Sequence, residues 1–271
     1  MKYRKDIDGL RSIAVSLVVL HHAGVHLISG GYVGVDVFFV ISGYLITGII
    51  YQQLLKNSFS FSEFYIRRIR RLMPALFGMI FVTTAFALVL LFPSDLLRYS
   101  NSLLWVSFYL GNFFFWREHG GYFAENTQEA PLLHTWSLAV EEHFYLIFPA
   151  FMVLCRKNWK RAATILMVLL AAVPLWRAFI MFGTDLPYAD YNYMMTDARF
   201  DSLAWGCLLS VLLHLKGNLK AFKPLLGFIP TALAGLAIIA SFLIRDETFR
   251  YTLRFTLQGA ALFVLVLNFY Y

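Results

Sequence analysis

Arg11 and His22 are separated by ten residues in a stretch that is otherwise mostly apolar. Eleven helical steps of about 100° make three turns plus about 20°, so a helix would place both side chains on one face. Histidine titrates near neutral pH and can take a proton from a hydroxyl group, which makes His22 a candidate general base. Two other interpretations stay open: a structural hydrogen bond inside a bundle, or half of a metal site with His26. No third ligand is evident, so we expect no metal.

A second group of polar side chains follows one helical face in the middle of the chain. His134, Ser137, Glu141 and Tyr145 stand at relative positions 0, 3, 7 and 11, a spacing that forms a stripe along a helix. Glu142 lies about 100° away from that stripe. Two adjacent carboxylates in an apolar segment are costly, so we predict a functional role with Glu141 as the catalytic carboxylate. The alternative is a buried network that only fixes helix packing.

Two more clusters contain acidic groups in apolar surroundings. Asp36 occurs in a run of apolar residues and glycines. Inside a membrane it needs a partner, and we expect a cation or histidine of the preceding apolar segment, which makes Asp36 a further catalytic candidate. Arg199 and Asp201 stand at the start of a later apolar segment, where we expect a local ion pair that holds the helix end.

Four arginines fall within five positions: Arg67, Arg68, Arg70 and Arg71 belong to the segment 64–74, which we expect to be a cytoplasmic loop. Guanidinium groups bind phosphate through paired hydrogen bonds. The segment could therefore hold a phosphate-bearing cytoplasmic ligand. Anionic lipid headgroups are an equally good explanation of the same cluster.

The composition indicates that membrane helices position these groups. Of the 271 residues, 59% are hydrophobic and only 14% are charged, whereas soluble domains carry about 25% charged residues. The net charge of +7 is explained by basic cytoplasmic loops, so we expect membrane lipids and no nucleic acid as partners. The two cysteines, Cys155 and Cys207, lie in apolar runs, which argues against a disulfide framework.

We predict an all-α fold, a polytopic transmembrane helical bundle with eight or nine crossings in a single domain over residues 1–271. A spanning helix needs about 20 mostly apolar residues. The stretch 97–116 is the weakest candidate because it carries several polar side chains. The positive-inside rule assigns the basic clusters and the N-terminus to the cytoplasm. The stronger candidates are 12–28, 33–54, 72–92, 136–155, 162–182, 200–215, 224–244 and 252–271.

Several of these clusters lie in stretches that form a specific combination of motifs. They are DIDGLRSIAVSLVVLHH at 6–22, GGYVGVDVFFVISGYLIT at 30–47, FYIRRIRRLMP at 64–74, PLLHTWSLAVEEHFYLIFP at 131–149 and RFDSLAWG at 199–206. In this combination the chain resembles the acyltransferase 3 family of integral membrane acyltransferases. The likeness is strongest to members that O-acetylate bacterial surface polysaccharides, such as the O-antigen of lipopolysaccharide.

The resemblance implies transfer of an acyl group, commonly acetyl, to a hydroxyl of a lipid-linked or surface saccharide. The donor substrate would be cytoplasmic acyl-CoA, with no permanently bound cofactor, and the location the bacterial inner or plasma membrane. The expected catalytic residues are His22, Glu141, Asp36 and Glu142. The expected substrate-binding residues are Arg11, Arg67, Arg68, Arg70, Arg71, Ser137, His134 and Trp136.

The chain also departs from the family pattern. His143 stands where Gln is common in the family. The family's last helix is missing, as is the extracytoplasmic SGNH domain of similar acetylases, so we expect a fragment or a shortened form. The main rival function is a transporter of an anionic or proton-coupled solute, because intramembrane His, Glu and Arg also build ion pathways. A non-catalytic membrane scaffold is a third possibility.

Overall fold

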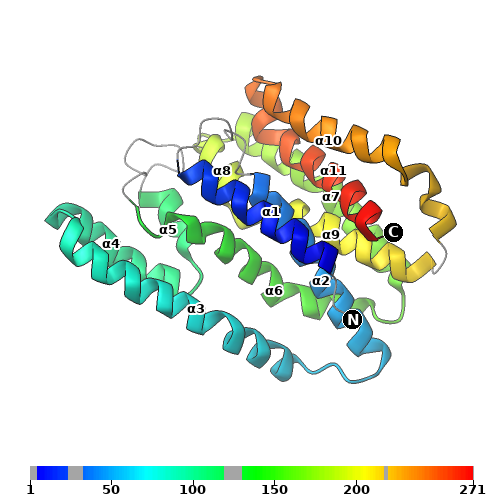
Figure 1. The fold of residues 1–271 in the computed structure, drawn as a ribbon, viewed down its shortest axis with the longest axis horizontal. Coiled ribbons are helices and arrows are strands. Elements are labelled where there is room, and N and C mark those ends of the chain that lie inside the picture. Colours follow the sequence, from blue (N-terminus) through cyan, green and yellow to red (C-terminus); the bar gives the residue numbers. More distant parts are fainter. Residues whose placement is uncertain (1–4, 24–32, 119–129, 217–218, 271) are drawn as a thin grey trace.

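The computed structural model describes residues 5–23, 33–118, 130–216 and 219–270, and every regular element within these ranges is helical. The helices run side by side as a bundle, with α3 and α4 along one edge and α10 along the other (Figure 1). The elements are α1 (Lys5–His22), α2 (Val33–Leu55), α3 (Phe61–Leu90), α4 (Pro93–Ser107), α5 (Gly111–Glu118), η3 (Leu133–Thr135), α6 (Trp136–Cys155), α7 (Trp159–Gly183), α8 (Tyr188–Met194), α9 (Thr196–Lys216), η4 (Leu219–Leu225), α10 (Phe228–Leu243), the π-helical turn η5 (Phe249–Leu253) and α11 (Arg254–Tyr270).

Six helical segments of the described chain are long and apolar enough to cross a membrane. They confirm the predicted all-α membrane fold, but not the predicted eight or nine crossings. The expected span 12–28 ends outside the described residues, and α10 has only 16 residues. The six segments are Val33–Leu55, Phe61–Leu90, Leu133–Cys155, Trp159–Gly183, Tyr188–Leu215 and Phe249–Tyr270.

The arginine-rich segment 64–74 is not a loop, contrary to the sequence-based expectation. It belongs to α3, which begins at Phe61 and continues through Pro74 to Leu90. Ser60 caps the helix by accepting a hydrogen bond from the backbone N–H of Glu63, in the Ser-x-x-Glu spacing of a capping box. The helix therefore starts before the arginines and presents them on its surface.

The stretch 97–116 is also interrupted. α4 ends at Ser107 and α5 begins at Gly111, and Tyr109 between them has a φ of 57°. The N–H groups of Tyr109 and Leu110 bond back to carbonyls of Val106 and Trp105, which is a Schellman helix end with Tyr where Gly is usual. This stretch therefore cannot cross a membrane as one straight helix.

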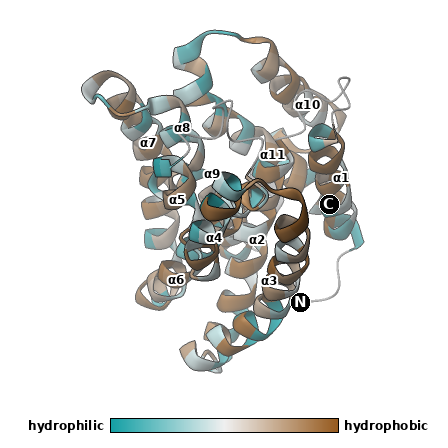
Figure 2. Cartoon of the chain, turned by 90° about the vertical axis from the view of Figure 1, so that its left-hand side faces the viewer, coloured by the Kyte–Doolittle hydropathy of each residue, from teal (hydrophilic) through white to brown (hydrophobic). Residues whose placement is uncertain are grey.

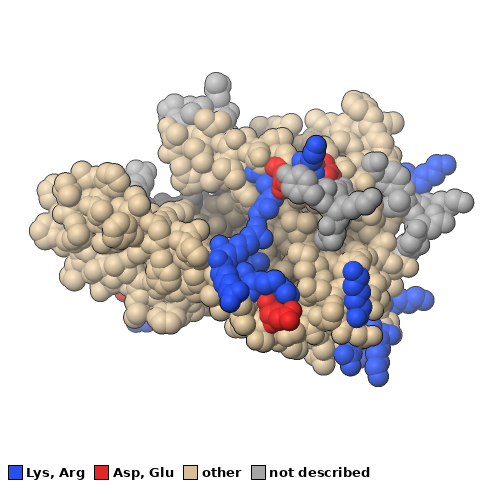
Figure 3. Space-filling model, turned by 60° about the horizontal axis from the view of Figure 1, so that its bottom comes forward, with Lys and Arg blue, Asp and Glu red and all other residues tan. Residues whose placement is uncertain are grey.

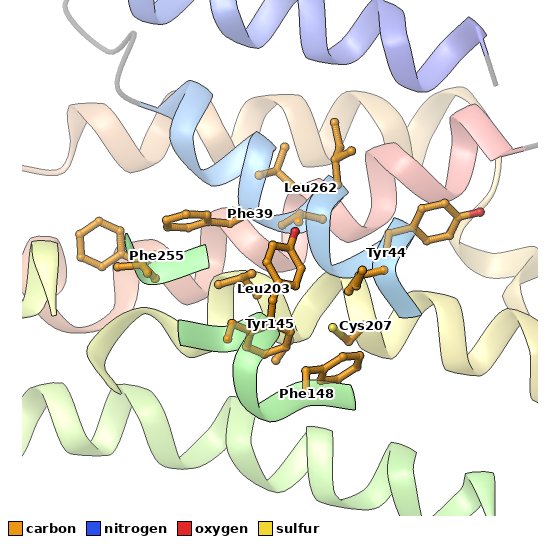
Figure 4. Packing of buried hydrophobic residues seen from close by; sticks show 14 of the residues in the cluster. Phe39, Tyr44, Tyr145, Phe148, Leu203, Cys207, Phe255 and Leu262 are labelled. Carbon is orange, nitrogen blue, oxygen red and sulfur yellow. The ribbon is translucent and has the colours of Figure 1, made fainter. Parts of the chain in front are cut away.

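The centre of the bundle is the contact between α2 and α9. A Cβ atom at Gly206 would lie 1.8 Å from the carbonyl oxygen of Val40, and one at Gly43 would lie 2.1 Å from that of Leu203. Small residues at these positions let the two backbones approach closely, as in other membrane helix pairs. Apolar side chains of α2, α6, α9 and α11 pack around this contact, including Phe39, Tyr44, Tyr145, Phe148, Leu203, Cys207, Phe255 and Leu262 (Figure 4).

The outer helices expose apolar side chains rather than polar ones. Phe81 is 76% and Val89 is 82% exposed on α3, and much of this helix has hydrophobic side chains (Figure 2). In water such a surface would aggregate. We therefore treat the chain as a membrane protein whose outer helices contact lipid.

Candidate active site

Arg68 joins α3 to α6 through a carboxylate and an aromatic ring. Its Nε and Nη2 atoms donate to Oε1 of Glu142 at 2.9 and 2.8 Å. The guanidinium carbon lies 3.3 Å from the centroid of the Tyr145 ring. Planar stacking and a two-pronged hydrogen bond are interactions that arginine makes and lysine does not. Arg68 is thus already engaged within the protein.

Side chains of three other helices act on the carboxylate of Glu141. The hydroxyl of Ser42 on α2 donates to its Oε1 at 2.8 Å, and Nη2 of Arg68 lies 4.0 Å from its Oε2. The charge of Arg11 on α1 acts on the same carboxylate. Glu141 and Glu142 are each about 15–16% exposed, so both remain accessible to small groups from outside the core.

α1 packs against α2 and α11 and runs in the opposite direction to α6 (Figure 1). The charge of Arg11 acts on Glu141, and that of His22 acts on His134. The exposed His22 has its Nδ1 atom 2.8 Å from the carbonyl oxygen of Val18. A carbonyl only accepts, so Nδ1 is the donor in this hydrogen bond. In the neutral tautomer that donates from Nδ1, Nε2 is the nitrogen that takes up a proton.

Three members of the predicted polar stripe, Ser137, Glu141 and Tyr145, lie on α6, while His134 lies on the preceding turn η3. Ser137 donates to the carbonyl of His134 at 3.3 Å, while Tyr145 is buried under Arg68. Trp136 is 2% exposed and its ring packs beside those of Phe39 and Tyr193. Its surroundings are those of a packing residue, and its expected role in substrate binding stays a prediction.

The other arginines of α3 point away from the core. Arg67 makes an exposed ion pair with Glu63 at 3.1 Å. Arg70 and Arg71 are exposed. Lys and Arg side chains gather beside a hollow on this side of the molecule (Figure 3). The four arginines therefore divide into one that binds Glu142, one that pairs with Glu63 on the surface, and the exposed Arg70 and Arg71.

Asp36 does not bind a group of α1, contrary to the sequence-based expectation. Its Oδ1 accepts from Nη2 of Arg199 at 2.6 Å and from the hydroxyl of Ser202 at 3.1 Å. Arg199 and Asp201 were expected to pair locally, and this was wrong too. Arg199 and Asp201 are two positions apart on α9, a rotation of about 200°, so Arg199 points to α2 while Asp201 points to α7.

Asp201 binds Arg177, a residue that the sequence analysis overlooked. Two nitrogens of Arg177 donate to Asp201 at 2.8 and 3.1 Å, and the hydroxyl of Thr256 donates to the same carboxylate. Arg177 stands in the apolar span of α7, which was itself a signal, because charged groups there need partners. Arg199 also lies 3.9 Å from the centre of the Phe255 ring. This buried cluster fixes α2, α7, α9 and α11 together.

His143 connects α6 to α9 and α5. Its Nδ1 lies 2.7 Å from the hydroxyl of Thr196, which accepts a hydrogen bond from Asn112 at 3.0 Å. Outside the membrane helices, burial raises the pKa of the Tyr109 phenol, and the charge of Glu142 adds to this.

Among the described residues, no group of three His, Cys, Asp or Glu side chains could hold a metal ion. His26 lies outside the described ranges. The candidate site is therefore the part-exposed cluster of Arg11, Arg68, Glu141 and Glu142, with His22 further along α1.

Comparison with known proteins agrees with the motifs at this site. A family model described as an acyltransferase domain matches residues 4–271. The chain belongs to the acyltransferase 3 family. Arg11 and His22 lie on α1, the four arginines on α3 and the two glutamates on α6, and the structure brings Arg68 of α3 into contact with Glu142 of α6.

Curated relatives carry related names. The peptidoglycan O-acetyltransferase OatA of Listeria monocytogenes is 35% identical over 270 residues, 98% of this chain and 43% of that protein. A putative peptidoglycan O-acetyltransferase of Bacillus subtilis, YrhL, is 35% identical over 79% of this chain and 34% of its own. A putative O-acetyltransferase of Staphylococcus aureus is 32% identical over 92% of this chain and 42% of its own length. The chain thus spans less than half the length of these relatives. No solved structure matches.

Proposed function

We propose that the protein transfers an acyl group, acetyl in the first instance, from acyl-CoA to a hydroxyl of a cell-surface saccharide. The observation that carries this proposal is the part-exposed cluster of Arg11, Arg68, Glu141 and Glu142, with a histidine on α1, in a chain of an acyltransferase family. Because the relatives are named for peptidoglycan, a cell-wall glycan is the acceptor we favour over lipopolysaccharide.

The reaction needs a base that takes the proton of the acceptor hydroxyl and a charged group that acts on this base. Nε2 of His22 takes the proton from the acceptor hydroxyl as its oxygen attacks the thioester carbonyl. The C–S bond then breaks, and the CoA thiolate receives the proton back from the imidazolium. Glu141 lies beside Arg11 and Arg68, and His22 is about 16 Å further along α1, so the carboxylate acts on the developing positive charge of His22 only at long range. Transient transfer of the acyl group to His22 itself is the second route.

The exposed arginines of α3 are suited to the donor. Arg67, Arg70 and Arg71 bind the phosphates of acyl-CoA at the cytoplasmic side, with the N-terminus of the chain on that side too. The protein would then lie in the bacterial cell membrane, with the donor and the acceptor arriving from opposite faces.

Two substitutions of neighbouring histidines test the role of His22. His22→Ala should abolish acetyl transfer from labelled acetyl-CoA to a glycan acceptor in proteoliposomes. His21→Ala is the matched control, because His21 points about 100° away on the same turn, and it should retain most of the activity. Equal losses in both variants would contradict a role for the face that Arg11 and His22 share.

Topology is tested by thiol labelling. Cys155 and Cys207 are buried, so a cysteine at the exposed Ser58, just before α3, should dominate the labelling. Ser58→Cys should react with an impermeant reagent only after the inner face is opened. Labelling in intact cells would remove the donor assignment of α3 and revive the transporter alternative.

A further inference from the structure

A cavity with polar and aromatic walls lies away from the glutamate cluster, between α4 and α5. It has a volume of about 520 Å³, which is within the ~300–1,000 Å³ of typical ligand pockets. We call it the α4–α5 pocket. It exists because the chain turns back at Tyr109, so that α5 folds against α4 instead of continuing it.

The walls of the α4–α5 pocket combine flat aromatic rings with polar groups. Trp105 and Phe113 are 38% and 41% exposed, so their rings are open to a ligand. The polar side chains at the pocket are Ser100, Asn101, Arg117 and Glu118. The indole N–H of Trp116, a further wall residue, is buried without a hydrogen-bond partner among the described residues.

This combination selects one class of ligand. A sugar ring has an apolar C–H face that stacks on aromatic rings and an edge of hydroxyl groups that exchange hydrogen bonds with amide, carboxylate and guanidinium groups. A lipid tail would leave Asn101, Arg117 and Glu118 without partners. A phosphate headgroup would be attracted by Arg117 but repelled by Glu118, so these two side chains give it no net positive site. The lining therefore fits an uncharged saccharide best.

The position of the pocket connects it to the candidate active site. The ring of Phe113 lies 5.5 Å from the ring of His143, the neighbour of Glu142. A second cavity of about 190 Å³ is lined by Tyr109, Glu142 and His143 on this same side of α6. α5 also packs against η3 and α8, at the end of the bundle where α6 begins (Figure 1).

Resting on the proposed function, we infer that the α4–α5 pocket is the subsite for the acceptor saccharide. A glycan chain held there by Trp105 and Phe113 would extend past His143 toward the glutamates. The exposed arginines of α3 then serve the donor, and the two substrates bind to different elements.

Binding and kinetics of the full chain in detergent test this assignment. The probe is a soluble tetrasaccharide of β-1,4-linked N-acetylglucosamine, with its Kd measured by calorimetry. Trp105→Ala should raise this Kd by at least about tenfold, as loss of a central aromatic contact does. Leu97→Ala is the control on the same helix, exposed but outside the pocket, and should change the Kd by less than about twofold.

A second variant controls for misfolding of Trp105→Ala. Kinetic measurements distinguish the saccharide subsite from the proposed acetyl transfer. Asn101→Ala removes an exposed side chain and should also weaken tetrasaccharide binding while the protein elutes as a single peak. The KM for acetyl-CoA should stay unchanged in both variants. Unaltered binding in Trp105→Ala, or no tetrasaccharide binding by the unmodified chain, would overturn the subsite. Trp105-dependent binding without acetyl transfer would support the subsite and contradict the proposed function.

Discussion

Arginine–carboxylate pairs occur in two regions of this bundle, and their surroundings differ. Arg199–Asp36 and Arg177–Asp201 have side-chain exposures of 0–2%, whereas Arg68 and Glu142 are 15–16% exposed. The buried pairs join four helices around Phe255 and leave no access for a substrate. The part-exposed pair lies beside a second carboxylate and the charge of Arg11. The same side-chain chemistry therefore fixes the fold in one region and is available for a reaction in the other.

The largest effect should come from breaking a buried pair. Arg199→Met leaves the carboxylate of Asp36 buried and uncompensated, which costs about 3–5 kcal/mol of unfolding free energy. Thermal unfolding in detergent and the fraction of monodisperse protein measure this loss. The double variant Asp36→Asn with Arg199→Met removes both charges and should recover much of the stability. A stable single variant would show that this pair does not fix the helices.

Substitution of the two glutamates tests which carboxylate of the candidate site is catalytic. Glu141→Gln should lower acetyl transfer per folded molecule by at least ~100-fold, the low end for removing a positioned acid–base group. Glu142→Gln should lose much less activity, or lose folded protein because Arg68 is left without its partner. A well-folded and inactive Glu142→Gln variant would assign the catalytic role to the other carboxylate.

Arg68→Lys should produce a smaller effect of a different kind. Lysine keeps the charge but cannot form the forked bond to Glu142 or stack on Tyr145. We expect kcat to fall about tenfold, because the loss of a hydrogen bond to a charged group costs about 1.5–3 kcal/mol and part of it is regained. The KM for acetyl-CoA should stay unchanged. A raised KM with normal kcat would instead make Arg68 a donor ligand.

Substitution of the exposed arginines should raise the KM for acetyl-CoA and leave kcat unchanged, the reverse of Arg68→Lys. It should also have the smallest effect on stability. Arg70→Gln with Arg71→Gln should leave the unfolding free energy within about 0.5 kcal/mol. The KM for acetyl-CoA should rise several-fold at low salt and less at high salt, because screening weakens exposed charges. Steady-state kinetics at two ionic strengths measure this. An unchanged KM would favour lipid headgroups as the ligand of these arginines.

Much of the architecture followed from sequence because it depends on local pattern. Apolar runs predicted the helices that begin near residues 33, 136, 162 and 252, each within three residues of the observed start. The start of α3 was missed although its capping box at Ser60 and Glu63 was readable.

The sequence by itself determined that the chain is a membrane-helix protein of the acyltransferase 3 family, and which ionisable side chains are costly enough to require partners. Composition and motif spacing fix these properties without any knowledge of how the helices pack. Only the tertiary structure decided the partners. Asp36 and Arg199 are 163 positions apart, and Arg68 and Glu142 are 74 apart. No helical period connects residues so distant in the sequence. Their pairing depends on which helices pack together and on how those helices are shifted along their axes.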